Sequence, residues 1–555
     1  MFYSNYVGQS GSIRGLSGTP SYVSNDKKNM ADRKPIPVID LFAGPGGLGE
    51  GFSSLTNTDG TPAFDLRVSI EKDFHAHQTL SLRALFRHFA KGKAPDCYYD
   101  YVKKKISRDA LFAHPEAKDA GNEALNEARL AELGKTPPDE IDKWISDALG
   151  DESNWVLIGG PPCQAYSLAG RSRRTKEDQK KFESDEKHFL YMEYLRIIRR
   201  FKPAVFVMEN VKGMLSSTHG GSGIFERIMT DLSSPGDGLN YGIRSFVVPG
   251  DTEHLSPMDF VIESEKFGIP QCRHRVILFG VRSDIASGTQ ELSVHPERFT
   301  IPTFPVPVSV SEALSGLPKL RSCLSRKSHE LDSHEAWLKV LRSTQAALGS
   351  WHGLESETFS SNLKIAVAES ASISSPGSHF IPWKSTPNSM GGRLHEWYFD
   401  EKLGGDIQHD TRSHMPSDLH RYMFASCYAK TFGFSPKVTQ FPKSLLPNHE
   451  NASDIDPPFA DRFRVQLASH PSSTVVAHVA KDGHYFIHPD PAQCRSLTVR
   501  EVARLQTFPD NYFFEGNRTQ QYTQVGNAVP PLLAKKIAIV VADFMRVSSR
   551  QITRP

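Results

Sequence analysis

Cysteine is scarce in this chain of 555 residues, and the six cysteines that occur lie far apart. No two of them form a C-x-x-C pair, the spacing typical of zinc sites and of thioredoxin-like redox centres. A secreted disulfide framework packs its cysteines densely into a short chain. We therefore expect a protein of a reducing, cytoplasmic compartment without a metal site. The six are Cys97, Cys163, Cys272, Cys323, Cys427 and Cys494.

Long apolar runs and an excess of one charge are also missing. No stretch approaches the roughly 18 apolar residues of a membrane span, and the N-terminus lacks the apolar core of a signal peptide. The formal net charge is only +2, so binding to a polyanion would depend on local patches. We expect a soluble protein with no membrane partner. Its length and its 38% hydrophobic content predict two folded domains.

A glycine loop follows the first ordered stretch. Residues 1–34 are rich in Ser, Gly and Asn and are expected to be disordered. The apolar run 37–42 then reads as a strand that ends at Phe42. Glycines follow in the G-x-G-x-x-G spacing, and Glu71 stands about 20 residues later at the end of another apolar run, as in dinucleotide-binding sites. The pattern itself requires only a close backbone approach, a helix N-terminus and a carboxylate for a ribose, so both NAD and S-adenosylmethionine fit it. The glycines are Gly44, Gly46 and Gly49.

One cysteine stands on a stiff turn. The apolar run 155–158 stops at Gly-Gly-Pro-Pro, and Cys163 comes next. The prolines fix φ, so we expect an exposed thiol just past a buried strand. The alternative is a small buried hydrophobe, the usual state of a free cysteine.

Charged residues flank two further strands. The run 204–208 leads into Glu209, and residues 271–275 lead into a strand over 276–280. Period-two geometry places Gln271, Arg273 and Arg275 on one face. Neighbouring guanidiniums repel each other unless they face anions, so a purely structural role would require carboxylate partners.

These segments together resemble the cytosine-5 DNA methyltransferases, and they occur in that family's usual order. The resemblance implies a Rossmann-like, doubly wound, mostly parallel α/β sheet with a smaller, loop-rich target-recognition domain. The catalytic domain would span 35–282 and 491–555, and the recognition domain 283–490. The matching segments are Asp-Leu-Phe-Ala-Gly-Pro-Gly-Gly (40–47), Pro-Pro-Cys-Gln-Ala-Tyr-Ser (161–167), Glu-Asn-Val (209–211), Q-x-R-x-R (271–275), 495–509 and 524–531.

The resemblance also implies a chemistry. The thiolate of Cys163 would add to C6 of a cytosine flipped out of double-stranded DNA, so that C5 can accept a methyl group from S-adenosylmethionine. Glu209 would share a proton with N3, and Arg273 and Arg275 would hold the base and this carboxylate. S-adenosylmethionine would be held by Phe42, Gly44, Gly46, Glu71 and Asn527. The resemblance also implies an acidic residue within 81–151 that contacts the adenine amine, but no local match identifies it here.

Other segments predict how the rest of the chain is arranged. Residues 81–151, including 120–130, have a helical, polar pattern typical of a solvated insertion. The basic segment 171–181 predicts a loop that contacts phosphates. Residues 410–414 and 420–422 are basic and aromatic and are expected to meet the substrate. Thr498 and Glu501 predict a capping box, and the apolar run 532–545 predicts a buried helix that returns to the first domain.

Several alternatives remain at this point. A tRNA cytosine-5 methyltransferase would use the same chemistry, although the large region 283–490 favours duplex DNA. An NAD-dependent oxidoreductase would leave Cys163 and the arginines without a task, and a cysteine hydrolase would need a histidine partner that no pattern identifies. A catalytically silent DNA binder would not need the reactive motifs. We expect a monomer on DNA; a restriction or defence partner is left open.

Overall fold

The computed structural model describes residues 34–162, 190–216, 218–219, 222–250, 254–326, 331–348, 356–387, 390–447 and 460–552. Cys163, the basic segment 171–181 and residues 1–33 of the N-terminal lead-in lie outside the described residues. No helix in these ranges is both long enough and apolar enough to cross a membrane.

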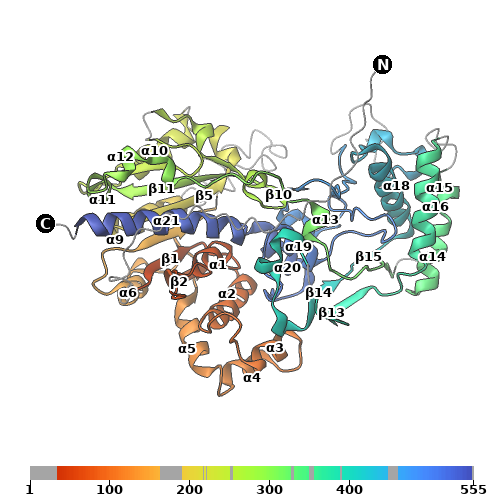
Figure 1. The fold of residues 1–555 in the computed structure, drawn as a ribbon, viewed down its shortest axis with the longest axis horizontal. Helices are drawn as coiled ribbons and strands as arrows, with labels where there is room; N and C mark the ends of the chain where they lie inside the picture. The colour runs from red at the N-terminus through yellow and green to blue at the C-terminus, as the bar shows by residue number, and fades with distance from the viewer. Residues whose placement is uncertain are drawn as a thin grey trace, which may run out of the picture.

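A twisted central sheet forms the first half of the molecule, in the strand order β3-β2-β1-β4-β5-β11-β8, with β9 paired to β11 (Figure 1). The first five strands in this order are parallel to one another, and β11 runs antiparallel to its neighbours β5, β8 and β9. The predicted doubly wound, mostly parallel sheet is thus confirmed. The strands are β1 (Ile36–Leu41), β2 (Phe64–Glu71), β3 (Ala128–Leu130), β4 (Val156–Gly159), β5 (Val205–Val211), β8 (Tyr241–Ser245), β9 (Val261–Glu263) and β11 (His274–Arg282).

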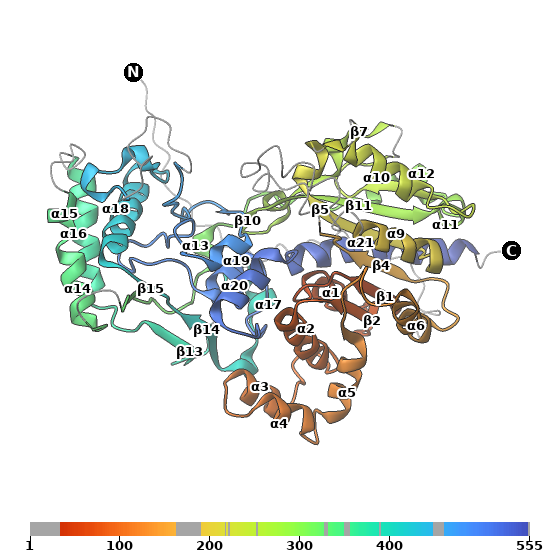
Figure 2. The ribbon, with the colours of Figure 1, turned by 180° about the vertical axis from the view of Figure 1, so that it is seen from behind.

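Helices cover both faces of this sheet. The short helix α1 (Gly47–Ser53) and the C-terminal helix α21 (Pro531–Ile552) pack together on one face, and the run 532–545 lies within this buried helix as predicted. The other face is covered by α6 (Pro138–Leu149), α9 (Leu190–Phe201) and α10 (Ile224–Ser233), as the view from behind shows (Figure 2). Apolar side chains on both faces of the sheet are therefore buried, as a parallel sheet requires.

The insertion between β2 and β3 is helical, but it ends differently from the prediction. It contains α2 (Phe74–Arg87), α3 (Asp96–Val102), α4 (Arg108–Ala113) and α5 (Lys118–Glu127), which share a small apolar core. The helix expected over 120–130 stops at Glu127, and Ala128–Leu130 form the edge strand β3 beside β2. A strand of three residues is too short for its periodicity to be recognised.

The region expected to form the recognition domain, residues 283–490, contains more helix than its sequence suggested. The helices α14 (His334–Arg342), α16 (Glu357–Ser370) and α18 (Pro416–Phe432) pack around a separate apolar core. Of the segments 410–414 and 420–422, which are expected to meet the substrate, His414 and Tyr422 are buried and present no side chain at the surface. The antiparallel pair of β13 (Gly377–Pro382) and β14 (Gly405–Asp410) extends back toward α3, where His379 Nε2 lies 2.8 Å from the carbonyl oxygen of Val102.

The two halves meet at α19 (Val499–Leu505) and α20 (Arg518–Asn527), which share a core with residues 310–314 and 475–479. The predicted capping box is confirmed: the amide of Glu501 donates to Thr498 Oγ1 at 3.2 Å, and the amide of Thr498 donates to the Glu501 carboxylate at 2.7 Å. Residues 283–301 belong to the first core, since Ile285 and Phe299 pack in the cluster that contains α21.

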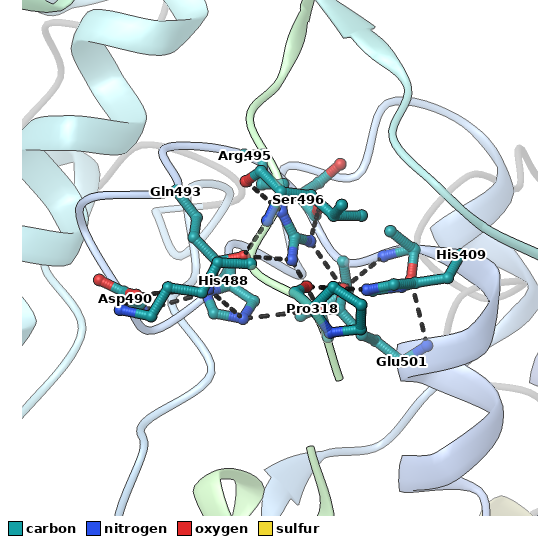
Figure 3. Close-up of polar contacts among 12 residues, drawn as sticks. Pro318, His409, His488, Asp490, Gln493, Arg495, Ser496 and Glu501 are labelled. Carbon is teal, nitrogen blue, oxygen red and sulfur yellow. Dashed lines mark hydrogen bonds and ion pairs between the residues drawn. The ribbon is translucent and has the colours of Figure 1, made fainter. Parts of the chain in front are cut away.

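A buried polar network fixes this junction (Figure 3). The guanidinium of Arg495 donates to both carboxylate oxygens of Glu501 at 2.7 Å and to the carbonyl of Leu320 at 3.1 Å. His409 of β14 lies 2.9 Å from Thr498 Oγ1 and 3.1 Å from the carbonyl oxygen of Pro318. Burial lowers the pKa of His409 to about 4, so this ring is neutral at physiological pH. The network therefore connects α19, β14 and the segment 318–320.

Candidate active site

The glycine loop and Glu71 meet at the carboxyl ends of β1 and β2. The amide of Gly44 donates to Glu71 Oε2 at 2.8 Å, and the amide of Asp73 donates to Oε1 at 2.7 Å. Phe42, Gly44 and Gly46 have φ values of 58°, 59° and 95°, so the loop turns through three left-handed conformations. Such turns favour glycine because it lacks a Cβ. Burial raises the pKa of Glu71, which is half-buried at the end of β2.

Among the described residues, there is space beside Gly44 but not beside Gly47. A Cβ placed on Gly44 would meet nothing within 4 Å. A Cβ on Gly47 would lie 2.3 Å from the carbonyl oxygen of Val529, so the C-terminal segment supports the loop from behind. The exposed residue Asn527 stands two positions before Val529. The open side at Gly44 is where a ligand can approach the backbone.

The turn that leads to Cys163 begins next to Glu209. A Cβ on Gly160 would lie 2.9 Å from Glu209 Oε2. Asn210 Nδ2 donates to the carbonyl of Pro161 at 3.3 Å, which holds the turn two residues before the cysteine. The described part of this turn, up to Pro162, therefore lies at the end of β4 beside the carboxylate of β5.

Arg275 is paired with Glu209. The distance from Arg275 Nε to Glu209 Oε1 is 2.9 Å, and the two side chains are only 15% and 14% exposed. Another guanidinium nitrogen of Arg275 donates to the carbonyl of His274 at 2.8 Å. An ion pair largely shielded from water holds both groups in one orientation. The carboxylate partner that a structural role would require is thus present for Arg275.

Arg273 has different contacts. The strand is interrupted at this residue, with β10 (Gln271–Cys272) before it and β11 after it. Its buried guanidinium donates to the carbonyl oxygens of Val475 at 2.8 Å and Gly526 at 3.2 Å. Burial, reinforced by the charge of Arg275, lowers its pKa. Backbone carbonyls thus take the place of the expected anions, and Arg273 joins the first half to Val475, which lies within 283–490, and to Gly526 of α20.

Three of the predicted groups that the structure describes, Gly44, Glu71 and Glu209, share one edge of the sheet, with small differences in position. Glu71 is the last residue of β2, whereas Glu209 lies within β5, two residues before its end, and pairs with Ile277. Gly44 follows β1 by three residues, and Cys163 follows β4 by four. Ligands of open α/β sheets bind at this edge. The arrangement brings a ligand-accessible loop, a carboxylate and an ion pair to one place.

One carboxylate at this edge was missed in the sequence. Glu132 follows β3 by two residues and lies 3.2 Å from the Nζ of Lys72, the residue next to Glu71. Its other carboxylate oxygen is 3.3 Å from the Nζ of Lys135. No local pattern marks Glu132; it could be identified only once Ala128–Leu130 were known to be a strand.

Comparisons with known proteins place this chain in one enzyme class. The model of the C-5 cytosine-specific DNA methylase family matches residues 131–542. The chain is 31% identical to the type II methyltransferase M.Bpa9945I of Bacillus paralicheniformis, over 92% of this chain and 99% of the relative. It is 26% identical to the type II methyltransferase M.AgeI of Thalassovita gelatinovora, over 91% and 98%.

One solved structure agrees at the level of the fold. An E. coli prophage-encoded protein described as a DNA modification methyltransferase superimposes with a TM-score of 0.51 at 19% identity, covering 92% of this chain and 99% of that chain. The fold and the sequence define the class as bacterial DNA-modifying methyltransferases. This chain belongs to the C-5 cytosine-specific DNA methylase family and is a DNA (cytosine-5-)-methyltransferase.

Proposed function

We propose that this enzyme transfers a methyl group from S-adenosylmethionine to C5 of a cytosine flipped out of double-stranded DNA, through a covalent adduct with Cys163. The observation that carries the proposal is the Glu209–Arg275 ion pair beside the turn that leads to Cys163. A nicotinamide oxidoreductase would have no use for this pair. The glycine loop also disfavours NAD as the cofactor.

The glycine loop suits S-adenosylmethionine better than a dinucleotide. Dinucleotide sites present free loop amides to a pyrophosphate. Here the amide of Gly44 is already bonded to Glu71, and the carboxylate of Glu71 can still accept from ribose hydroxyls. Phe42, Gly44, Gly46, Glu71 and Asn527 would hold the cofactor, which supplies an electrophilic methyl group when bound.

The chain's own groups would prepare the base. The Cys163 thiolate adds to C6 of cytosine while Glu209 delivers a proton to N3, and this makes C5 nucleophilic. Arg275 keeps the Glu209 carboxylate in place. After methylation, the proton leaves C5, the thiolate leaves C6 and the N3 proton returns to Glu209, which restores the neutral aromatic ring and frees Cys163. In this scheme Arg273 stabilises the site indirectly, through its hydrogen bonds to the carbonyls of Val475 and Gly526.

Glu132 is our candidate for the carboxylate that contacts the adenine amine. It lies past the end of β3, next in the sheet to the strand that ends at Glu71. We expect Glu132→Gln to weaken binding of S-adenosylhomocysteine by at least about tenfold, the effect of losing one charge-assisted hydrogen bond. Glu123→Gln, which changes an exposed carboxylate of α5, is the matched control and should leave binding unchanged.

Methylome sequencing tests the proposal. DNA from cells that express the chain should carry 5-methylcytosine at a defined sequence, and DNA from cells that express Cys163→Ala should not. Parallel bisulfite sequencing of RNA examines the tRNA alternative. Methylated tRNA with unmodified DNA would contradict the proposal, as would full DNA methylation by Cys163→Ala.

We further propose that residues 283–490 recognise the DNA sequence, that a monomer acts on DNA, and that the enzyme belongs to a restriction-modification system, as the type II names of its relatives suggest. Base edges are recognised by side chains on variable loops, whereas the chemistry needs fixed groups. A graft from a relative should therefore redirect methylation to that relative's site. The graft should retain residues 283–301, which belong to the first core.

A further inference from the structure

Tyr512 reaches the glycine loop from the segment between α19 and α20. The side chain is fully buried, and its hydroxyl donates to the carbonyl oxygen of Pro45, which stands between Gly44 and Gly46. A Cβ on Gly46 would lie 3.0 Å from the same hydroxyl. Gly46 caps α1 and has no side chain with which to stabilise the turn. The loop is therefore held by a residue that lies more than 400 positions later in the chain.

Tyr512 is itself fixed from two sides. The guanidinium of Arg500, which is fully buried, donates to the Tyr512 carbonyl at 2.7 Å. The guanidinium carbon of Arg83 lies 4.8 Å from the centre of the tyrosine ring. Arg83 also donates to both carboxylate oxygens of Glu50, on α1, at 2.6 and 2.8 Å. The hydroxyl is thus presented to the loop by a side chain with little freedom to move.

The loop needs such support because of its conformation. Phe42, Gly44 and Gly46 all have positive φ, and glycines have many other conformations available. A loop that spends only part of its time in the competent form binds its ligand more weakly in proportion to that fraction. Once the ligand is bound, the loop is held and the chemical step is unaffected.

We propose that Tyr512 is a positioning residue for the cofactor: its hydroxyl holds the Pro45 carbonyl and thereby keeps the turn in which Gly44 donates to Glu71. The inference rests on the proposed function, in which this loop holds S-adenosylmethionine. Tyr512 acts through the loop and has no part in the reaction.

The test compares two tyrosine-to-phenylalanine variants of the full chain. Tyr512→Phe removes the bond to Pro45. Tyr241→Phe is the matched control: this buried hydroxyl donates to the carbonyl of Pro203 at 2.7 Å, from β8 at the far edge of the sheet. Isothermal titration with S-adenosylhomocysteine should show a Kd about fivefold higher for Tyr512→Phe, the effect of one neutral hydrogen bond. Tyr241→Phe should have the wild-type Kd.

Kinetics separate positioning from a general loss of structure. With unmethylated genomic DNA as substrate, Tyr512→Phe should raise KM for S-adenosylmethionine by a similar factor and leave kcat at saturating cofactor within about twofold, because only the free loop is affected. Three results would overturn this inference and leave the cofactor proposal standing. They are a wild-type Kd in Tyr512→Phe, an equal rise of the Kd in Tyr241→Phe, and a fall in the kcat of Tyr512→Phe without a change in its KM. A wild-type chain that binds no S-adenosylhomocysteine would overturn the cofactor proposal and this inference with it.

Discussion

Arg275 Nε lies 2.9 Å from Glu209 Oε1, at the edge of the sheet where the turn to Cys163 begins. The two residues belong to neighbouring antiparallel strands, β11 and β5, so their backbones are fixed by the sheet. A carboxylate held in this way keeps one orientation without the help of a substrate. Such preorganisation reduces the rearrangement needed when charge develops on a bound base.

Removing the guanidinium should therefore affect catalysis more than folding. We expect Arg275→Ala to lower kcat on the order of 100-fold, because Glu209 loses the partner that orients it. Arg282→Ala is the control: this arginine is on the same strand, and its partner Asp284 is exposed. Steady-state assays on genomic DNA would measure both. Equal kcat values in the two variants would contradict the assignment of Arg275.

Arg273 should show the opposite pattern. Arg273→Ala leaves the carbonyls of Val475 and Gly526 without this buried donor and opens a cavity between the two halves. We expect a loss of about 3 kcal/mol in the free energy of unfolding, measured with urea. Arg282→Ala should lose under about 1 kcal/mol, as is usual for a pair with an exposed partner. A stable Arg273→Ala variant that is inactive would favour direct contact with the base instead.

The contrast between these two arginines shows what the sequence could predict. The alternation of side chains along a strand predicted that Arg273 and Arg275 share one face and one role. In the structure the strand is interrupted at Arg273, and the two side chains have different partners. Local patterns were sufficient for the glycine loop, the capping box at Thr498 and the C-terminal helix, because each depends on residues close together in the sequence. The contact of Gly44 with Glu71 follows from the parallel pairing of β1 and β2.

The missed features depend on distant contacts. The helix α18 buries a continuous run from Tyr422 to Ala429, so it lacks the one-sided apolar pattern by which a surface helix is recognised. The strand β3 forms by pairing with β2, and this pairing brings Glu132 to the edge of the sheet near Glu71. Tyr512 contacts Pro45 across most of the chain, and no sequence spacing indicates this.

Alkylation should distinguish Cys163 from the other cysteines. Burial raises the pKa of all five described cysteines, to about 11 for Cys272 and about 12 for Cys427. At pH 8 these remain thiols and should react slowly with iodoacetamide, since the thiolate is the nucleophile. We expect Cys163 to be modified at least about tenfold faster, as measured by peptide mass spectrometry. Faster labelling of the half-buried Cys272 or Cys323 would count against an exposed, reactive Cys163.

Asp406 should make stability depend on pH. This aspartate of β14 is 1% exposed, and burial raises its pKa to about 6 although Arg504 opposes the shift. The folded state thus binds the proton more tightly than the unfolded state, whose pKa is ordinary, so stability falls as the pH rises from about 4 to about 6. Above that range the penalty is constant at up to about 3 kcal/mol.

Asp406→Asn removes this penalty while keeping the shape of the side chain. We expect the free energy of unfolding to rise by about 1–2 kcal/mol at pH 8, with a smaller gain at pH 5 and none near pH 4. Asp410→Asn, on the same strand, loses an ion pair with Arg518 and should gain nothing. Urea unfolding at the three pH values checks this; a gain independent of pH would show that Asp406 is not the titrating group.

The contact between α1 and α21 should tolerate no added atom. A Cβ on Gly51 would lie 2.3 Å from Ala534 Cβ and 2.4 Å from the backbone nitrogen of Lys535, and backbone atoms of a long helix cannot move aside cheaply. Gly51→Ala should therefore push the two helices apart at a cost of about 1–3 kcal/mol, seen as a lower Tm. Because α1 begins at the glycine loop, S-adenosylhomocysteine should also raise the Tm of this variant by less than it raises that of the wild type.

A second glycine provides the control for this last prediction. At Gly242, on the edge strand β8, the nearest atom to an added Cβ is the Val281 carbonyl oxygen at 4.0 Å, and its φ is not positive. Gly242→Ala should keep both the Tm and the shift that S-adenosylhomocysteine produces. If Gly51→Ala loses stability but retains the full ligand shift, then α1 can move without disturbing the loop, and the support that Tyr512 and Val529 give to the loop is sufficient to hold it.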